Sequence, residues 1–231
     1  MALIRVRASW RALLALTVAA CASVPEAGRA QVVGGAGTAG TARIDSAARQ
    51  PANPGLIPAN YGSLKRDDLA LTVQLQGLTI RAIPLDESVI RALAPDSYTS
   101  LHALREAHAT ELDRMRPRLG LSTIQAWYVQ YFNVQQGEAR YDPRDVQIRS
   151  AGRDFRPLDV IPLVTGFQDG RLAQGRSVDA IFAFDPAVSV SQPLVVTLGG
   201  KSTSAWADQL LGLLERERAA IWSRAAVARR P

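Results

Sequence analysis

The chain has 231 residues, of which 47% are hydrophobic and 21% charged, a composition typical of a globular protein. Setting aside residues 1–20 with their three arginines lowers the formal net charge from +6 to +3, because 24 basic and 21 acidic residues remain. So small an excess argues against a nucleic-acid-binding protein, which needs a concentrated basic face. Beyond the N-terminal region no apolar run is long enough to predict a membrane-spanning helix.

Residues 1–20 have the pattern of a secretory signal. Arg5, Arg7 and Arg11 occur without any acidic residue, and a short apolar run follows over residues 12–20. A basic segment followed by 7–15 apolar residues and then small residues is typical of an export signal, and the run is too short to remain in a bilayer as a helix. We therefore expect an exported protein.

Cys21, the chain's one cysteine, directly follows this apolar run, so no disulfide can form within the chain. The segment Val18-Ala19-Ala20-Cys21 resembles the lipobox of bacterial lipoproteins, whose cysteine is acylated and becomes the new N-terminus. The resemblance implies a signal peptide over residues 1–21, lipidation of Cys21 and a lipid anchor in the cell envelope. Ordinary cleavage remains the alternative, because Ala20-Cys21-Ala22 also fits a small-x-small site. The product would then be secreted, or soluble in the periplasm.

Residues 22–68 are predicted to form a flexible tether. Glycine, alanine and proline dominate most of the segment, and little apolar periodicity is present to drive burial. Such a composition does not offset the entropy of ordering. A flexible chain of about forty residues spans roughly 35 Å, enough to hold a domain away from a membrane surface.

Residues 69–231 are predicted to form one folded domain that is mainly β with helices. Period-two alternation begins at Leu69, and Gly77 suggests a bulge or bend in that strand. Residues 84–119 form a helical insertion with a short helix and then one helix of about twenty residues, closed by Pro117 and Gly120. Further strands are predicted at residues 122–134, 146–148, 177–184 and 194–198. Apolar residues on both faces of 122–134 indicate a central, doubly covered strand.

The chain ends in a predicted helix with an apolar stripe. Its candidate partner-binding residues are Trp206, Leu210, Leu213 and Trp222. Such a stripe also fits a helix packed on the domain core, so the sequence leaves both interpretations open.

The stretch from Tyr128 to Phe184 resembles the telokin-like, immunoglobulin-like domains of bacterial exported lipoproteins. The resemblance rests on Tyr141-Asp142-Pro143-Arg144-Asp145-Val146 and on the segment Gln174 to Phe184. Gln174 and Ala180 replace the proline and glycine of the family pattern, and the helical insertion is not part of it. The resemblance implies an immunoglobulin-like antiparallel β-sandwich and a place in the envelope. It implies no shared chemistry.

Few residues suggest catalysis, so we expect a non-enzymatic binding or structural protein without a cofactor. Neither a Gly-x-Ser-x-Gly motif nor a complete phosphate-binding loop occurs. A metal-dependent hydrolase is one alternative, and it would use His108, Glu111 and the turn residues Asp142, Asp145, Asp154 and Asp159. The other is an envelope assembly factor that docks a protein partner through the C-terminal helix.

Overall fold

The computed structural model describes residues 56–228, so Cys21 and residues 22–55 of the expected tether lie outside the described residues. The folded body begins earlier than the predicted boundary at residue 69. Ile57 is only 4% exposed, and helix α1 spans Arg66–Leu69. The segment 56–68 is therefore part of the body, which corrects the tether boundary, because its apolar side chains are buried against distant parts of the chain.

The larger sheet has five antiparallel strands in the order β1-β2-β3-β9-β7. Their bounds are Leu71–Leu75, Leu78–Pro84, Gln125–Asn133, Ser177–Phe184 and Asp159–Pro162, in that order. Gly77 does not make a bulge; with a φ of +78° it lies in the tight turn that reverses the chain between β1 and β2. Strand β3 lies between β2 and β9, which confirms the predicted central strand.

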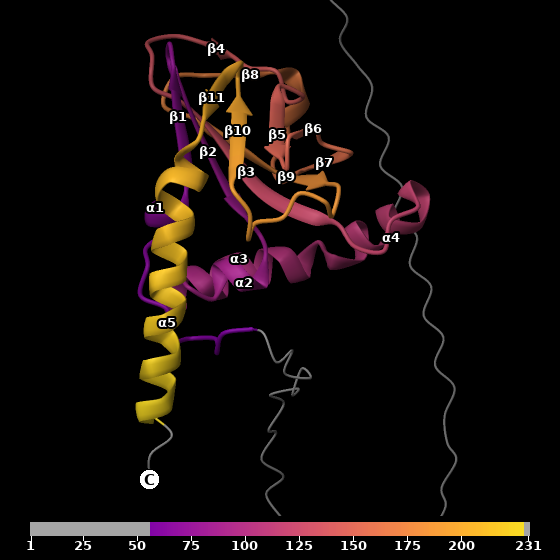
Figure 1. Cartoon of the computed structure of the whole chain (residues 1–231). Helices are drawn as coiled ribbons and strands as arrows, with labels where there is room; N and C mark the ends of the chain where they lie inside the picture. The colour runs from indigo at the N-terminus through magenta and orange to yellow at the C-terminus, as the bar shows by residue number, and fades with distance from the viewer. Residues whose placement is uncertain (1–55, 229–231) are drawn as a thin grey trace, which may run out of the picture. The chain divides into compact units, whose positions relative to one another are not determined.

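The second sheet has the order β11-β10-β5-β6, and a third consists of the short strands β4 and β8. The bounds are Lys201–Thr203, Leu194–Leu198, Val146–Ser150 and Arg153–Phe155 for the four-stranded sheet, and Ala139–Arg140 and Arg171–Leu172 for the small one. Ala151 and Gly152, both with positive φ, form the turn between β5 and β6. The protein is thus an antiparallel β-sandwich with helices (Figure 1).

The core lies between the two larger sheets. Alternate residues of β3 point inward, and Trp127 contacts Phe184 and Trp206 at centroid separations of 6.5 and 5.9 Å. The four-stranded sheet contributes the buried side chains of Val146, Ile148, Leu194, Val196 and Leu198. Burial on both sheets is what holds a disulfide-free body together.

Three helices, α2 (Glu87–Ile90), α3 (Pro95–Ala107) and α4 (Ala109–Leu119), form the insertion between β2 and β3. The sequence predicts one long helix where α3 and α4 stand, but the helix is interrupted at His108, whose φ of -105° and ψ of 7° are not helical. Gly120 ends α4 in the left-handed conformation, as expected of a glycine at a helix C-terminus.

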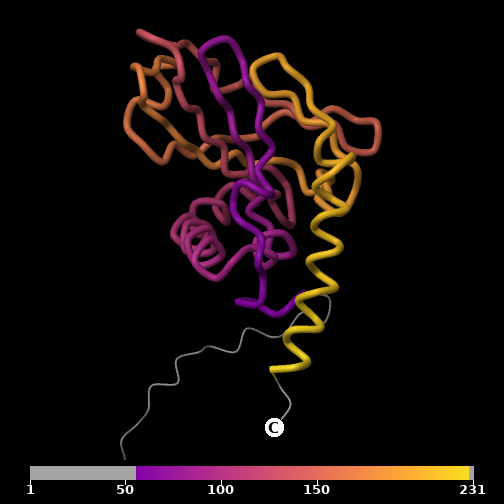
Figure 2. Tube along the Cα trace, turned by 90° about the vertical axis from the view of Figure 1, so that its left-hand side faces the viewer, coloured from indigo at the N-terminus to yellow at the C-terminus, as the bar shows by residue number. Residues whose placement is uncertain are grey.

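A π-helical turn, η2 (Trp206–Leu210), follows β11 and leads into helix α5 (Leu211–Ala228). Helix α5 runs away from the sandwich, past the helical insertion (Figure 1). In both views the segment before α1 lies beside helix α5 (Figure 2). Within residues 56–228, no helix combines the length and apolar character that crossing a bilayer requires.

Candidate functional site

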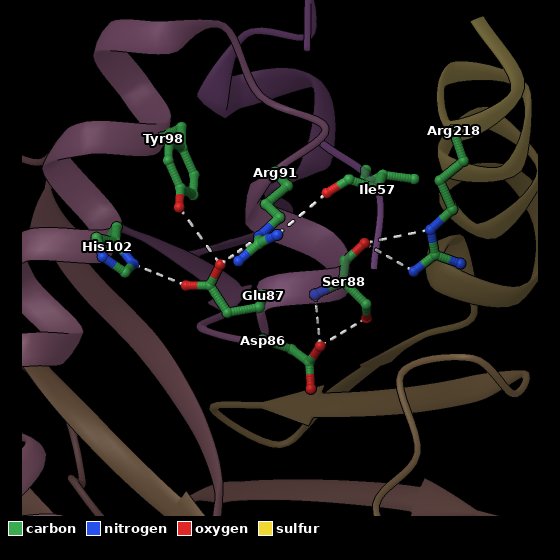
Figure 3. A network of polar contacts seen from close by, with 8 residues as sticks. All are labelled: Ile57, Asp86, Glu87, Ser88, Arg91, Tyr98, His102 and Arg218. Atoms are coloured by element: carbon green, nitrogen blue, oxygen red, sulfur yellow. Dashed lines mark hydrogen bonds and ion pairs between the residues drawn. The ribbon is translucent and has the colours of Figure 1, made fainter. Parts of the chain in front are cut away.

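A network of polar side chains is centred on the short helix α2, and we call it the α2 network (Figure 3). Asp86 begins the helix as its N-cap: its Oδ1 accepts hydrogen bonds from the Ser88 backbone N–H at 2.8 Å and from the Ser88 hydroxyl at 2.5 Å. Such a cap satisfies backbone N–H groups that a helix start leaves without partners. The network comprises Ile57, Asp86, Glu87, Ser88, Arg91, Tyr98, His102 and Arg218.

Glu87 is the centre of this network. Its carboxylate accepts from Arg91 Nε at 2.6 Å, lies 2.7 Å from His102 Nδ1, and accepts from the Tyr98 hydroxyl at 3.4 Å. Burial by itself would raise the pKa of this carboxyl, but the hydrogen bonds from Arg91 and His102 outweigh burial and lower the pKa below its usual value. The Tyr98 and His102 rings stack at 5.3 Å between centroids. Glu87 therefore joins α2 to α3 through a charged, partly buried contact.

The α2 network holds two of the three members of a catalytic triad, a histidine beside a carboxylate, but the nearby serine does not complete it. A nucleophilic serine must donate to the histidine base. The Ser88 hydroxyl donates instead to Asp86, which leaves it engaged in the cap. Arg91 also donates to the Ile57 carbonyl at 3.2 Å. These contacts connect separate segments of the chain, and they do not place Ser88 as a nucleophile beside His102.

Two charged residues of helix α5 form hydrogen bonds with α2 and with the segment before α1. Arg218 donates twice to the Ser88 carbonyl, at 3.2 and 2.8 Å. Glu217 accepts from the Ser63 backbone N–H and hydroxyl at 2.8 and 2.9 Å, and from Arg224 at 2.6 Å. Burial would raise the Glu217 pKa, yet the bonds from Arg224 and Ser63 lower it overall. A carboxylate therefore stands within the buried stripe of α5, which comprises Leu214, Glu217, Ile221 and Ala225.

An open depression of about 430 Å³ lies where α5 meets α2 and the segment before α1, and we call it the α5 depression. Trp222 lines it and is 47% exposed. The other lining residues are Ile57, Ser88, Ser191, Glu215, Arg218 and Ala219. An aromatic side chain held beside a depression is a common anchor for a protein partner.

The four candidate partner-binding residues do not share one surface. Trp206 is fully buried, and its indole N–H donates to the Val190 carbonyl at 3.2 Å. A partner cannot reach it, which corrects the prediction for this residue: η2 directs it between the sheets. Leu210 and Leu213 are half-buried against the core. Of the four, Trp222 alone is largely exposed.

The residues of the alternative metal site are not brought together. His108 Nδ1 is 3.5 Å from Glu111 Oε2, and no third ligand joins them. The turn aspartates have other contacts: Asp142 accepts from the Arg144 backbone, Asp154 pairs with Arg149, and Asp159 lies 3.5 Å from Arg118. In the part of the chain that the structure describes, no three His, Cys, Asp or Glu side chains are placed to share a metal ion.

The sequence does not identify Glu87, His102 or Glu217 as site residues. The i,i+4 spacing of Glu87 and Arg91 signals a pair on one helix face, and the structure shows that pair. A second signal is the position of Glu217 within an apolar helical stripe. Neither pattern identifies the distant partner, because Ser63 lies 154 residues from Glu217 along the chain.

Comparisons with known proteins add little. No protein-family model matches the chain, and no curated protein matches it. A solved structure of a functionally unknown protein from Listeria monocytogenes EGD-e aligns over 55% of this chain and 68% of its own length. Its sequence identity is 12% and the TM-score is 0.29, values too low to support any statement about function.

Proposed function

We propose that this chain is a non-enzymatic binding or structural lipoprotein, anchored to the cell envelope through Cys21. One observation carries the proposal: an arginine-bearing segment, a short apolar run and the chain's one cysteine follow one another directly, in the order that export and lipidation require. Residues 22–55 separate this cysteine from the part of the chain that the structure describes.

The contacts of the body favour a binding or structural role over catalysis. The most concentrated set of polar side chains, the α2 network, engages its serine in a helix cap and its carboxylate in ties to Arg91 and His102. These residues fix the helical insertion and α5 in place. The body can then offer a binding surface without catalysing a reaction.

The anchor is tested by metabolic labelling with radioactive palmitate in a bacterial host, together with mass spectrometry of the mature N-terminus. We expect label on the wild-type protein, none on Cys21→Ala, and an acylated cysteine as the first residue. Because the chain has no other cysteine, cysteine-linked label can come from no second site. An unacylated N-terminus at Ala22 or further along would support ordinary cleavage and overturn the anchor.

We propose the α5 depression as the place where an envelope protein docks. The supporting observation is Trp222, 47% exposed beside Ile57 and Ala219. Co-purification from envelope extracts would be compared between the wild type and Trp222→Ala, with Val227→Ala as the control because Val227 is 67% exposed on the same helix. We expect Trp222→Ala alone to lose a specific partner. Equal recovery by both variants would contradict docking at this site.

A further inference from the structure

The outer face of the five-stranded sheet is divided into a covered part and an open part. One row of paired residues across the strands, Ile83, Tyr128, Ile181 and Ile161, is buried. The helical insertion covers this end of the face, since Leu112 of α4 and Ala126 of β3 line the same depression. Beyond the insertion, two further rows face outward: Thr72, Arg81, Gln130 and Asp179, then Gln74, Thr79, Phe132 and Ser177.

The open rows form a polar surface with one aromatic ring near its centre, and we call it the Phe132 face. Phe132 is 40% exposed and lies between Thr79 on β2 and Ser177 on β9. The surface is hollowed by about 380 Å³, and the depression is lined by Thr72, Gln74, Thr79, Arg81, Gln130, Phe132 and Val134. Four of these residues carry hydroxyl or amide groups that can both donate and accept hydrogen bonds.

Arg81 is the one charged residue among those that line the depression. Arg81 pairs with Asp67 at 3.0 Å, and Asp179 accepts from the Tyr128 hydroxyl at 2.9 Å. Burial, followed by the Asp179 charge, raises the Tyr128 pKa to about 12, so the phenol keeps its proton at neutral pH. A ligand in the depression therefore meets hydroxyl and amide groups around an apolar ring, and an arginine that is already paired with an aspartate.

We propose that the Phe132 face binds a neutral oligosaccharide. A sugar ring has an apolar C–H side that fits flat against an aromatic ring, and hydroxyls at its rim that suit the amides of Gln74 and Gln130 and the hydroxyls of Thr72 and Thr79. Glycans are the polyhydroxylated polymers that an exported protein meets. The choice of a glycan rests on the proposed export of the chain, but it does not depend on lipidation of Cys21.

The Phe132 ring and the polar side chains around it contribute separately to the proposed binding, so different variants test each of them. Phe132→Tyr keeps a flat ring, whereas Phe132→Leu keeps apolar volume but loses the flat surface. Leu158→Ala is the matched control, because Leu158 is 41% exposed but is not among the residues lining this depression. Gln74→Ala removes one amide from an exposed strand position.

The test is isothermal titration of the purified full chain with chitotetraose, cellotetraose and maltotetraose, each up to about 10 mM, the range in which weak binding is still measurable. We expect at least one to bind, with an affinity about tenfold lower in Phe132→Ala and Phe132→Leu, which is roughly the contribution of one buried side chain. Phe132→Tyr and Leu158→Ala should bind as the wild type does. Gln74→Ala should weaken binding severalfold.

Two results would overturn the proposal. One is no measurable binding of any of the three sugars. The other is binding that Phe132→Ala and Gln74→Ala leave unchanged. Circular dichroism of each variant establishes that it is folded, and Gln74→Ala decides the question should Phe132→Ala fail to fold. If sedimentation shows that Phe132→Ala abolishes a dimer while no sugar binds, the face pairs two copies of this chain and binds no glycan.

Discussion

Trp206 and Trp222 belong to one continuous C-terminal stretch, yet they occupy opposite environments. Trp206 is completely buried and lies 5.9 Å from Trp127 between centroids, whereas Trp222 is 47% exposed beside the α5 depression. The difference arises because the chain enters the helix through η2, which directs Trp206 into the sandwich, while the later turns of α5 run past its end. Two tryptophans in one predicted helix thus have different roles: one belongs to the core and the other lies on a surface.

The sharpest test of this contrast is Trp206→Ala. Removing a fully buried tryptophan should lower the free energy of unfolding by about 3–5 kcal/mol, a large part of the total stability of a domain. Urea denaturation followed by circular dichroism measures the change. Trp206→Phe should recover part of it. A loss below about 1 kcal/mol would mean that the core closes without Trp206.

Glu217 tests whether the buried stripe of α5 depends on its carboxylate. Glu217→Ala leaves the Ser63 N–H and Arg224 without this partner and should cost about 2–3 kcal/mol. Glu215→Ala is the control two residues away, since Glu215 is 58% exposed and pairs with Arg218, and it should cost less than about 1 kcal/mol. Equal effects from the two substitutions would contradict a special role for the buried residue.

The partners of the buried carboxylates should also make stability depend on pH, although this effect is smaller than that of Glu217→Ala. Glu87 and Glu217 both have carboxyl pKa values held below the ordinary 4.5 in the folded state. Their stabilising contribution is therefore present above about pH 4.5 and is lost as the pH falls through the lower folded values. Urea midpoints measured from pH 6 to about pH 3 should fall less steeply in Glu217→Gln than in the wild type. Parallel curves would show that Glu217 has the same pKa in both states.

Trp222→Ala should have the smallest effect on stability. About half of the side chain is exposed, so we expect a change of at most about 1 kcal/mol in the free energy of unfolding. The same urea titration measures it. A loss as large as that of Trp206→Ala would place Trp222 in the core and remove it as a docking residue.

Sequence periodicity located most of the strands and little of the site. The predicted strands 177–184 and 194–198 have the bounds of β9 and β10; burial alternates along β10, whereas the second half of β9 is buried throughout. The sequence does not predict the strands β4, β7, β8 and β11, since runs of two to four residues are too short to show a period. The α2 network could not be predicted because it joins residues from separate helices.

The sequence by itself determined the candidate export signal, Cys21 as its one possible acylation site, and a disulfide-free β-rich body. These follow from composition and local pattern, which do not require contacts across the chain. Only the tertiary structure decided that Trp206 is core, that Glu217 accepts hydrogen bonds from Ser63, and that part of the outer sheet face stays open around Phe132. The physical reason is that burial depends on which distant segment covers a residue, and periodicity shows only that some segment can.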